Sequence, residues 1–159
     1  MVLLRSLALI ALLVFTAACE NKPSGSGLSA AETFKETTDA EVNAALAAAK
    51  EKARAEGKWV LLEFVASWCT DCREVAKIAR QEPAASVLAE KYIVVPVNVG
   101  RFNRNKALIA EHQIKVIAAL VVIDADGKRI AKTTLEPITK KNSLTSESLA
   151  DWLKSPKDS

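Results

Sequence analysis

The segment LLEFVASWCTDCR, residues 61–73, decides the fold of this chain. Residues 60–66 form an apolar run with one acid inside it, as expected for a buried β-strand. A helix is expected directly afterwards, over about residues 70–80. The pattern therefore predicts a strand that leads into a helix, with a pair of cysteines at the start of that helix.

The position of the two cysteines gives them their expected chemistry. A thiolate at a helix N-terminus faces unpaired backbone N–H groups and the positive end of the helix dipole, so we expect Cys69 to be the attacking sulfur. Cys72 lies almost one turn later and can resolve a mixed disulfide. The alternatives are half of a zinc knuckle, which lacks its second cysteine pair, and a structural disulfide, which would constrain the unfolded chain little.

Outward from this segment, the apolar pattern predicts an α/β domain. Residues 93–99 and 120–123 are apolar runs typical of buried strands, and residues 124–127, Asp-Ala-Asp-Gly, predict a hairpin turn into a fourth strand near 128–134. The first expected helix runs from Asp39 as N-cap to Gly57, and the next covers about residues 70–80. A shorter helix follows Pro83 and ends near Ala89, another covers 103–112, and the last begins after Thr145 as N-cap.

The N-terminus has the pattern of an export signal. Arg5 precedes the uncharged run 7–18, which is shorter than the roughly 20 residues that span a bilayer. Residues 15–19 resemble the lipobox of bacterial lipoproteins, and an unpaired exported thiol would be a liability, so we expect Cys19 to be lipidated rather than left by an ordinary cleaved signal. A Gly/Ser-rich tether follows. The expected division is a signal peptide over 1–18, a lipidated N-terminus and flexible tether over 19–38, and a folded domain over 39–155.

Composition limits the kind of protein this can be. The chain has 159 residues, half of them apolar and 26% charged, which suits one compact domain. Its formal net charge is +3, from 22 basic and 19 acidic residues, so nothing demands nucleic acid as a partner. Three cysteines and one histidine cannot alone build a zinc site of four cysteines, or one of two cysteines and two histidines, and they are too few for a disulfide-stapled miniprotein.

The stretch from Leu61 to Cys72 resembles the active-site strand and helix of the thioredoxin superfamily. The resemblance covers about residues 40–154, and it is strongest to exported members similar to the C-terminal domain of the periplasmic thiol:disulfide interchange reductase. It implies a thioredoxin fold, with a central mixed four-stranded sheet flanked by helices. It also implies that Cys69 is the nucleophile and Cys72 the resolving thiol.

The same resemblance implies roles for two neighbours of the cysteines. Trp68 matches the aromatic residue that flanks the site, and we expect it to contact substrate. Glu63 lies six residues before Cys69, where thioredoxins carry a buried acid that moves the proton of the resolving cysteine. An ionised carboxylate is costly to bury in an apolar strand, so its pKa should rise toward the range useful for proton transfer. A water-exposed acid on one strand face is the alternative.

The chain departs from the superfamily opposite the dithiol. Members carry a cis-proline there, and Ala118 takes its place. A cis bond before a non-proline residue costs about 3–4 kcal/mol, so we expect the Ile117–Ala118 bond to be trans. Backbone next to that proline pairs with the client peptide in the family, which makes Ile117 and Ala118 candidate substrate-binding residues. We expect His112 to face solvent, and no metal site is assigned.

Two functions from different classes remain open. One is a membrane-tethered protein-disulfide reductase that needs no cofactor beyond its Cys69/Cys72 dithiol, and the other is a thioredoxin-fold protein whose dithiol captures metal or senses redox state. We favour the enzyme. Its partners would be client protein disulfides, an upstream thiol electron donor and, through a lipid anchor on Cys19, a membrane facing the periplasm or extracytoplasmic space. The local charges do not decide the direction of the reaction, because Asp71 disfavours a nearby thiolate and Arg73 favours it. The resemblance implies that the direction is reduction of the client.

Overall fold

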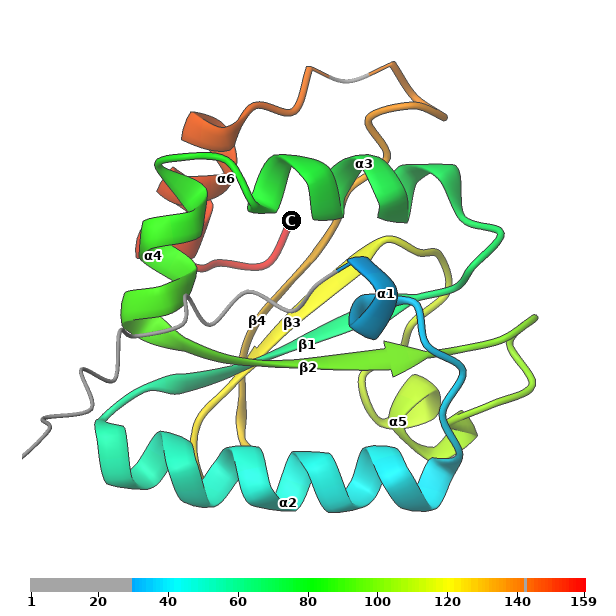
Figure 1. Ribbon diagram of the computed structural model, residues 1–159, viewed down its shortest axis with the longest axis vertical. Coiled ribbons are helices and arrows are strands. Elements are labelled where there is room, and N and C mark those ends of the chain that lie inside the picture. The colour runs from blue at the N-terminus through cyan, green and yellow to red at the C-terminus, as the bar shows by residue number, and fades with distance from the viewer. Residues whose placement is uncertain (1–29, 142) are drawn as a thin grey trace, which may run out of the picture.

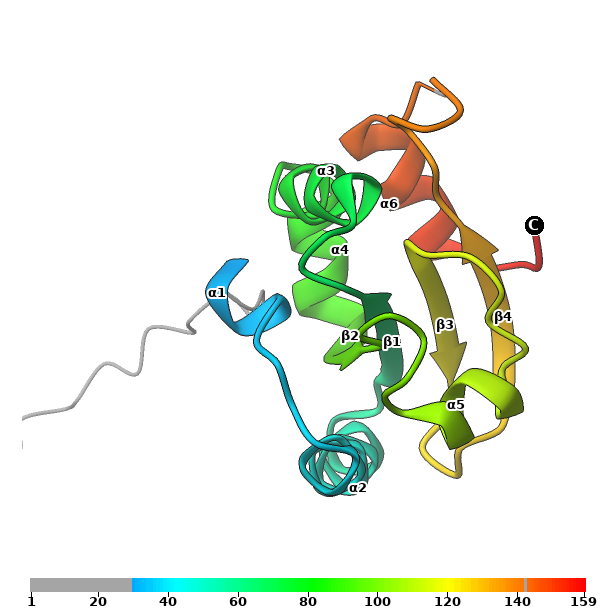
Figure 2. The same ribbon diagram turned by 90° about the vertical axis from the view of Figure 1, so that its right-hand side faces the viewer.

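A four-stranded mixed sheet forms the centre of the computed structural model, which describes residues 30–141 and 143–159 (Figure 1). Figure 2 shows the strands in the order β2, β1, β3 and β4. β1 runs parallel to β2 and antiparallel to β3, and β3 pairs antiparallel with β4. The strands are β1 (Trp59–Val65), β2 (Tyr92–Asn98), β3 (Ala119–Ile123) and β4 (Arg129–Thr134). The expected mixed sheet is confirmed, with each strand within one residue of its predicted start.

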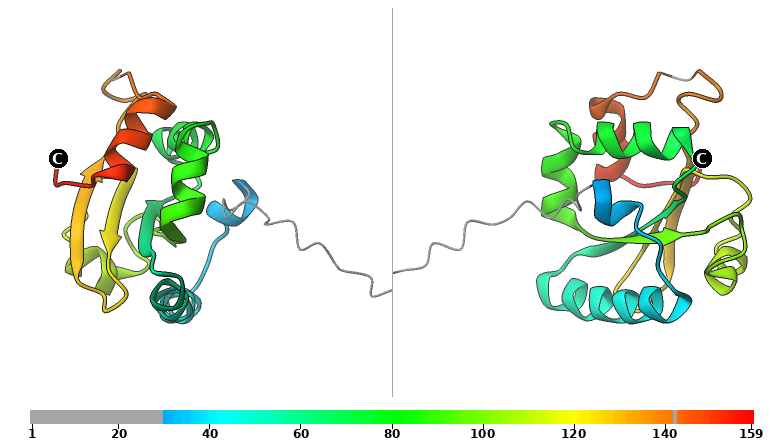
Figure 3. Two further views of the ribbon diagram at one scale, coloured as in Figure 1. Left: turned by 90° about the vertical axis from the view of Figure 1, so that its left-hand side faces the viewer. Right: turned by 45° about the vertical axis from the view of Figure 1, so that its right-hand side comes forward.

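Helices cover both faces of the sheet. α3, α4 and α6 lie on one face, and α2 and α5 lie on the other (Figures 1 and 3). None of the helices described is long and apolar enough to cross a membrane. The helices are α1 (Ala30–Thr33), α2 (Asp39–Glu56), α3 (Thr70–Ala79), α4 (Ala84–Lys91), α5 (Lys106–Glu111) and α6 (Ser146–Lys154).

The central strand β1 divides the core into two parts, because successive side chains of a strand point to opposite faces. Val60, Leu62 and Phe64 are buried against the α2 side. Leu61 is buried on the other side, with apolar residues of α4 and α6. Glu63 shares the parity of Leu61, so it points into the layer of α3 and α4.

Helix boundaries follow local capping chemistry. Thr38, not Asp39, is the N-cap of α2: its hydroxyl accepts a hydrogen bond from the Glu41 amide at 3.2 Å, and the Glu41 carboxylate accepts one from the Thr38 amide at 2.7 Å. The prediction of Asp39 as cap is therefore wrong by one residue, since only Thr38 has an acid at the third helical position to return the bond. Thr145 caps α6 as predicted.

The helix expected over 103–112 is shorter than predicted. α5 begins at Lys106, because Phe102 and Asn105 have positive φ angles of 60° and 52°, which a helix cannot contain. The Asn105 side chain donates to the Asn98 carbonyl at 2.8 Å and holds this turn at the end of β2. The expected break between α3 and α4 near Pro83 and the hairpin at 124–127 are both present.

The chain adds to the fold before residue 39. Phe34 packs on the core, the Asn98 side-chain amide donates to the Phe34 and Lys35 carbonyls at 3.4 and 3.3 Å, and Arg104 pairs with Glu36 at 2.7 Å. Part of the segment expected to be a tether therefore lies along the β2 edge of the sheet. The predicted signal peptide and Cys19 lie outside the described residues.

Candidate active site

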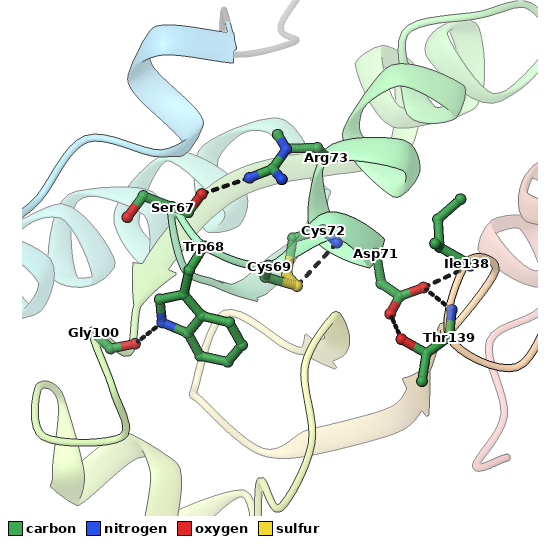
Figure 4. The surroundings of a disulfide bond; sticks show 9 residues. All are labelled: Ser67, Trp68, Cys69, Asp71, Cys72, Arg73, Gly100, Ile138 and Thr139. Atoms are coloured by element: carbon green, nitrogen blue, oxygen red, sulfur yellow. Dashed lines mark hydrogen bonds between the residues drawn. A yellow bond between two sulfur atoms is a disulfide. The ribbon is translucent and has the colours of Figure 1, made fainter.

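Cys69 and Cys72 are joined in a disulfide at the start of α3 (Figure 4). Cys69 is the N-cap residue, and its Sγ accepts a hydrogen bond from the Cys72 amide at 3.0 Å. This is the helix N-terminal placement that the sequence predicted. Both residues are nearly buried, with 4% of Cys69 and 1% of Cys72 exposed.

A groove of about 250 Å³ lies beside the disulfide, and we call it the active-site groove. Cys69 lines it and Cys72 does not, so the two sulfurs differ in access. Four parts of the chain form its walls: residues 68–71, the loop that carries Phe102, the loop of residues 115–117, and the segment after β4 that carries Glu136 and Thr139.

Trp68 forms part of the apolar wall of the groove. Its side chain is 48% exposed, yet its indole N–H donates to the Gly100 carbonyl at 2.8 Å. Figure 4 shows the ring beside the disulfide and directed toward Gly100. The ring thus offers an apolar face to the groove while its polar atom is satisfied.

The charged residues next to the cysteines are bound to different groups. The Arg73 guanidinium donates to the Ser67 carbonyl at 2.6 Å. Asp71 is buried and accepts hydrogen bonds from the Ile138 amide at 2.7 Å, the Thr139 amide at 3.1 Å and the Thr139 hydroxyl. Burial by itself would raise the pKa of Asp71, but the bonds from Thr139 and Ile138 outweigh it and place the pKa below its ordinary value. Asp71 is therefore a fixed negative charge at neutral pH.

The Ile117–Ala118 peptide bond is cis, so the expectation of a trans bond is wrong. The local preference is overridden by tertiary packing: both residues are buried, and the Ala118 carbonyl accepts a hydrogen bond from the Leu135 amide at 2.8 Å. Ile117 lines the active-site groove, whereas Ala118 lies behind it.

Glu63 is buried, with 9% of its surface exposed. Burial raises its pKa to about 7, against the opposing attraction of the Arg80 guanidinium. The carboxyl group adjoins a cavity of about 30 Å³, room for one water, that is also lined by Ala76 and Arg80 of the α3 end. Neither cysteine lines that cavity, so Glu63 is separate from the active-site groove.

His112 does not face solvent as expected. It is 3% exposed at the end of α5, and its ring meets that of Phe64 edge-on at 6.0 Å. Burial lowers the pKa of His112, opposed by the Glu111 carboxylate 3.9 Å away. The described part of the chain contains no group of three or more His, Cys, Asp or Glu side chains that could hold a metal ion.

Several residues around the dithiol were not predicted from the sequence, among them Gly100, Phe102, Val116, Glu136 and Thr139. Gly100 had a detectable signal, since a lone glycine after a strand marks a turn. Phe102, Glu136 and Thr139 had none, because they reach the groove only through tertiary contacts from 30 or more positions away along the chain.

Comparison with known proteins agrees with this geometry. A family model described as thioredoxin-like matches residues 41–125. Thiol:disulfide interchange protein DsbD 2 of Pseudomonas aeruginosa is 31% identical over 113 residues, which are 70% of this chain and 19% of that protein. Its counterpart DsbD from Salmonella typhi is 30% identical over 89 residues, 55% of this chain and 15% of that protein. The chain thus spans less than a fifth of the length of these curated relatives.

Two solved structures share the fold. The crystal structure of a disulphide isomerase from Xylella fastidiosa Temecula1 is 32% identical, superposes with a TM-score of 0.62, and the match covers 76% of this chain and 93% of that one. The oxidised C-terminal domain of DsbD from Neisseria meningitidis is 20% identical with a TM-score of 0.57, over 78% of this chain and 98% of that domain, which supports the fold alone.

Proposed function

Because the chain belongs to the thioredoxin-like family, we propose that it is a thiol:disulfide oxidoreductase that reduces disulfide bonds of extracytoplasmic proteins. The observation that carries the proposal is the asymmetry of the cysteine pair: Cys69 caps α3 and lines an open groove, and Cys72 is buried behind it. This arrangement suits one thiol that meets substrate and a second that acts only within the protein.

In the proposed reaction, the reduced protein is the electron donor. The Cys69 thiolate attacks one sulfur of a client disulfide, which forms a mixed disulfide and expels the other client sulfur as a thiolate. The Cys72 thiolate then attacks Cys69 Sγ, which releases the second client thiol and leaves the Cys69–Cys72 disulfide. Two electrons pass to the client, and an upstream thiol donor returns the pair to the dithiol form.

We place the client segment in the active-site groove. Trp68 offers an exposed aromatic face there, and the backbone groups of Val116 and Ile117 make no hydrogen bond to the described residues. These groups would pair with the backbone of an extended client peptide. Ala118, whose carbonyl accepts a hydrogen bond from the Leu135 amide, would shape this docking loop from behind.

Glu63 would serve the resolving step. Its pKa of about 7 suits proton transfer near neutral pH, and its cavity reaches Ala76, one helical turn after Cys72 on the same side of α3.

Trapping of the mixed disulfide tests the proposal. Reduced Cys72→Ser protein should accumulate a covalent adduct with a peptide disulfide through Cys69, because the resolving thiol is missing. Reduced Cys69→Ser protein should form far less adduct, since Cys72 is buried. Mass mapping of the linked peptides decides, and equal adduct formation by both variants would contradict the assignment of roles.

The direction of the reaction rests on the reduction potential of the pair. Equilibration of the domain with glutathione buffers should give a reducing value, as expected for a donor of electrons. A strongly oxidising value would reverse the proposed direction while leaving the exchange chemistry in place.

We also propose that export and lipidation of Cys19 tether the domain to a membrane. The proposal rests on the sequence pattern of residues 1–27 alone. Several acyl chains hold a protein firmly on a bilayer, so Cys19→Ser should release the domain into the soluble fraction without altering dithiol activity. Wild-type protein that is already soluble after export would rule out the anchor.

A further inference from the structure

Asp71 links the start of α3 to a distant part of the chain. It lies between the two cysteines in sequence, yet its carboxylate turns away from Trp68 toward Ile138 and Thr139 (Figure 4). One oxygen, Oδ1, accepts from both backbone amides, and the other, Oδ2, accepts from the Thr139 hydroxyl. The partners are 67 and 68 positions away.

These bonds are the main attachment of the segment that follows β4. Within the described residues, no other hydrogen bond or ion pair joins residues 136–141 to the rest of the protein, since the Glu136–Lys140 ion pair at 2.6 Å is internal to the segment. Ile138 is 51% exposed, so apolar packing does not hold it instead. The placement of the segment therefore depends on Asp71.

The same segment forms one wall of the active-site groove. Glu136 and Thr139 line the groove together with Cys69 and Asp71. Across the groove, the opposite flank is fixed by the bond from the Trp68 indole to Gly100. A client held near Cys69 would thus contact two walls, each fastened by a polar anchor next to a cysteine.

We propose that Asp71 is a positioning residue that fastens residues 136–139 beside the dithiol and thereby sets how tightly the groove binds a polypeptide client. The proposal rests on the proposed function, because it concerns the client of that same site. The reduction of small disulfides, which do not need residues 136–139 as a binding wall, should depend little on the hydrogen bonds to Asp71.

Two substitutions separate the effect of the hydrogen bonds to Asp71, which anchor the segment, from the effect of its charge. In Asp71→Asn, the side-chain oxygen can accept from both amides and the side-chain NH₂ can donate to the Thr139 hydroxyl, so the anchor is kept and the charge is lost. In Asp71→Ala, both are lost. Any difference between these two variants is therefore due to the anchor alone.

The experiment measures reduction of insulin and of glutathione disulfide by wild-type, Asp71→Asn and Asp71→Ala protein. We expect the KM for insulin to be about five- to tenfold higher in Asp71→Ala than in Asp71→Asn, as for the loss of buried hydrogen bonds, with similar kcat. The two variants should reduce glutathione disulfide at the same rate. An equal KM for insulin in both variants would overturn the proposal.

A matched pair at Thr139 repeats the test with Asp71 intact. Thr139→Ser keeps the hydroxyl donor and Thr139→Val removes it at similar volume, so only Thr139→Val should raise the KM for insulin. This pair decides the matter if Asp71→Ala does not fold.

Hydrogen exchange gives a readout that needs no activity. The amides of Ile138 and Thr139 should be protected in wild type and Asp71→Asn and exchange faster in Asp71→Ala. If wild-type protein reduced neither disulfide, the proposed function would fail, while the exchange result would still show whether Asp71 holds the segment. Unchanged protection in Asp71→Ala overturns the anchor itself.

Discussion

Glu63 is an ionisable residue in a part of the core that disfavours its charged form. Its carboxyl group is enclosed by a strand and two helices whose neighbouring side chains are mostly apolar, and its strongest compensating partner is the Arg80 guanidinium. An ionised group is disfavoured in such a place, so the protein tolerates Glu63 best in its protonated form.

The pH dependence of stability should report this directly. The unfolded chain loses the Glu63 proton near pH 4.5 and the folded chain near 7, so the folded state binds more protons between these values. The contribution of Glu63 to the free energy of unfolding is therefore greatest below pH 4.5 and falls by about 3 kcal/mol as the pH rises past 7.

Urea denaturation of Glu63→Gln and wild type at several pH values checks the sign. The variant should gain stability relative to wild type as the pH rises from 4.5 to 8, because glutamine cannot ionise. Glu90→Gln, which removes an exposed carboxyl group, is the control and should show no such trend. A constant difference between Glu63→Gln and wild type would mean that Glu63 is hydrated in the folded state.

The kinetic role proposed for Glu63 has its own test at this scale. Glu63→Gln should slow the resolution of a preformed mixed disulfide at Cys69 by at least about tenfold near pH 7, where proton transfer assists the Cys72 thiol. The wild-type rate should titrate with a group near 7, and the variant rate should not. Stopped-flow fluorescence of the released client measures both, and unchanged kinetics would exclude the relay.

At the scale of elements, the turn after β2 positions the aromatic wall of the groove. Gly100 has a φ of +57°, and its carbonyl accepts the indole N–H of Trp68 at 2.8 Å. A Cβ atom at this position would crowd the side chains of Asn103 and Arg104. Gly57, at the end of α2, has a similar φ of +65° but open space around it.

These two glycines form a matched pair. Gly57→Ala should cost about 1 kcal/mol, the penalty of an L-residue in the left-handed region. Gly100→Ala should cost more, about 2–3 kcal/mol, because crowding adds to that penalty. It should also speed hydrogen exchange of the Trp68 indole N–H, whereas Gly57→Ala should not. Denaturant midpoints and the NMR signal of that proton check both, and equal costs would show that the turn relaxes freely.

At the scale of the whole molecule, the segment before α2 connects the N-terminal part of the chain to the β2 edge. It supplies Thr38 as the cap of α2, the packing of Phe34, and the carbonyls that accept from Asn98. These contacts join the chain just before α2 to the end of β2, 63 and 64 positions later in the sequence.

A chain that begins at Asp39 should therefore be less stable than one that begins at Ala30. We expect a loss of about 2–3 kcal/mol, from a helix cap worth about 1 kcal/mol and a partly buried aromatic side chain worth about 1–2. Chemical denaturation of the two chains gives the difference, and Phe34→Ala in the longer chain isolates the packing contribution. Equal denaturation midpoints for the two chains would show that the folded unit begins at residue 39.

Local signals were sufficient for much of this protein. The strands at 59–65, 92–98 and 119–123 were predicted from apolar runs at 60–66, 93–99 and 120–123, and Thr145 was predicted as a cap, because such patterns depend on neighbours one to four positions away. The position of Cys69 at the start of α3 followed from the same rules, since a strand that runs into a helix is a local event.

Tertiary structure decided the rest. The burial of His112, the cis bond before Ala118 and the hydrogen bond from the Thr139 amide to the Asp71 carboxylate could not be derived from sequence. Each depends on groups that lie tens of positions away along the chain, or on packing that overrides a local preference. The sequence by itself determined where the reactive sulfurs lie on the fold, whereas only the packing of distant loops determined the walls of the groove around them, because contacts at such separations leave no periodic pattern in the chain.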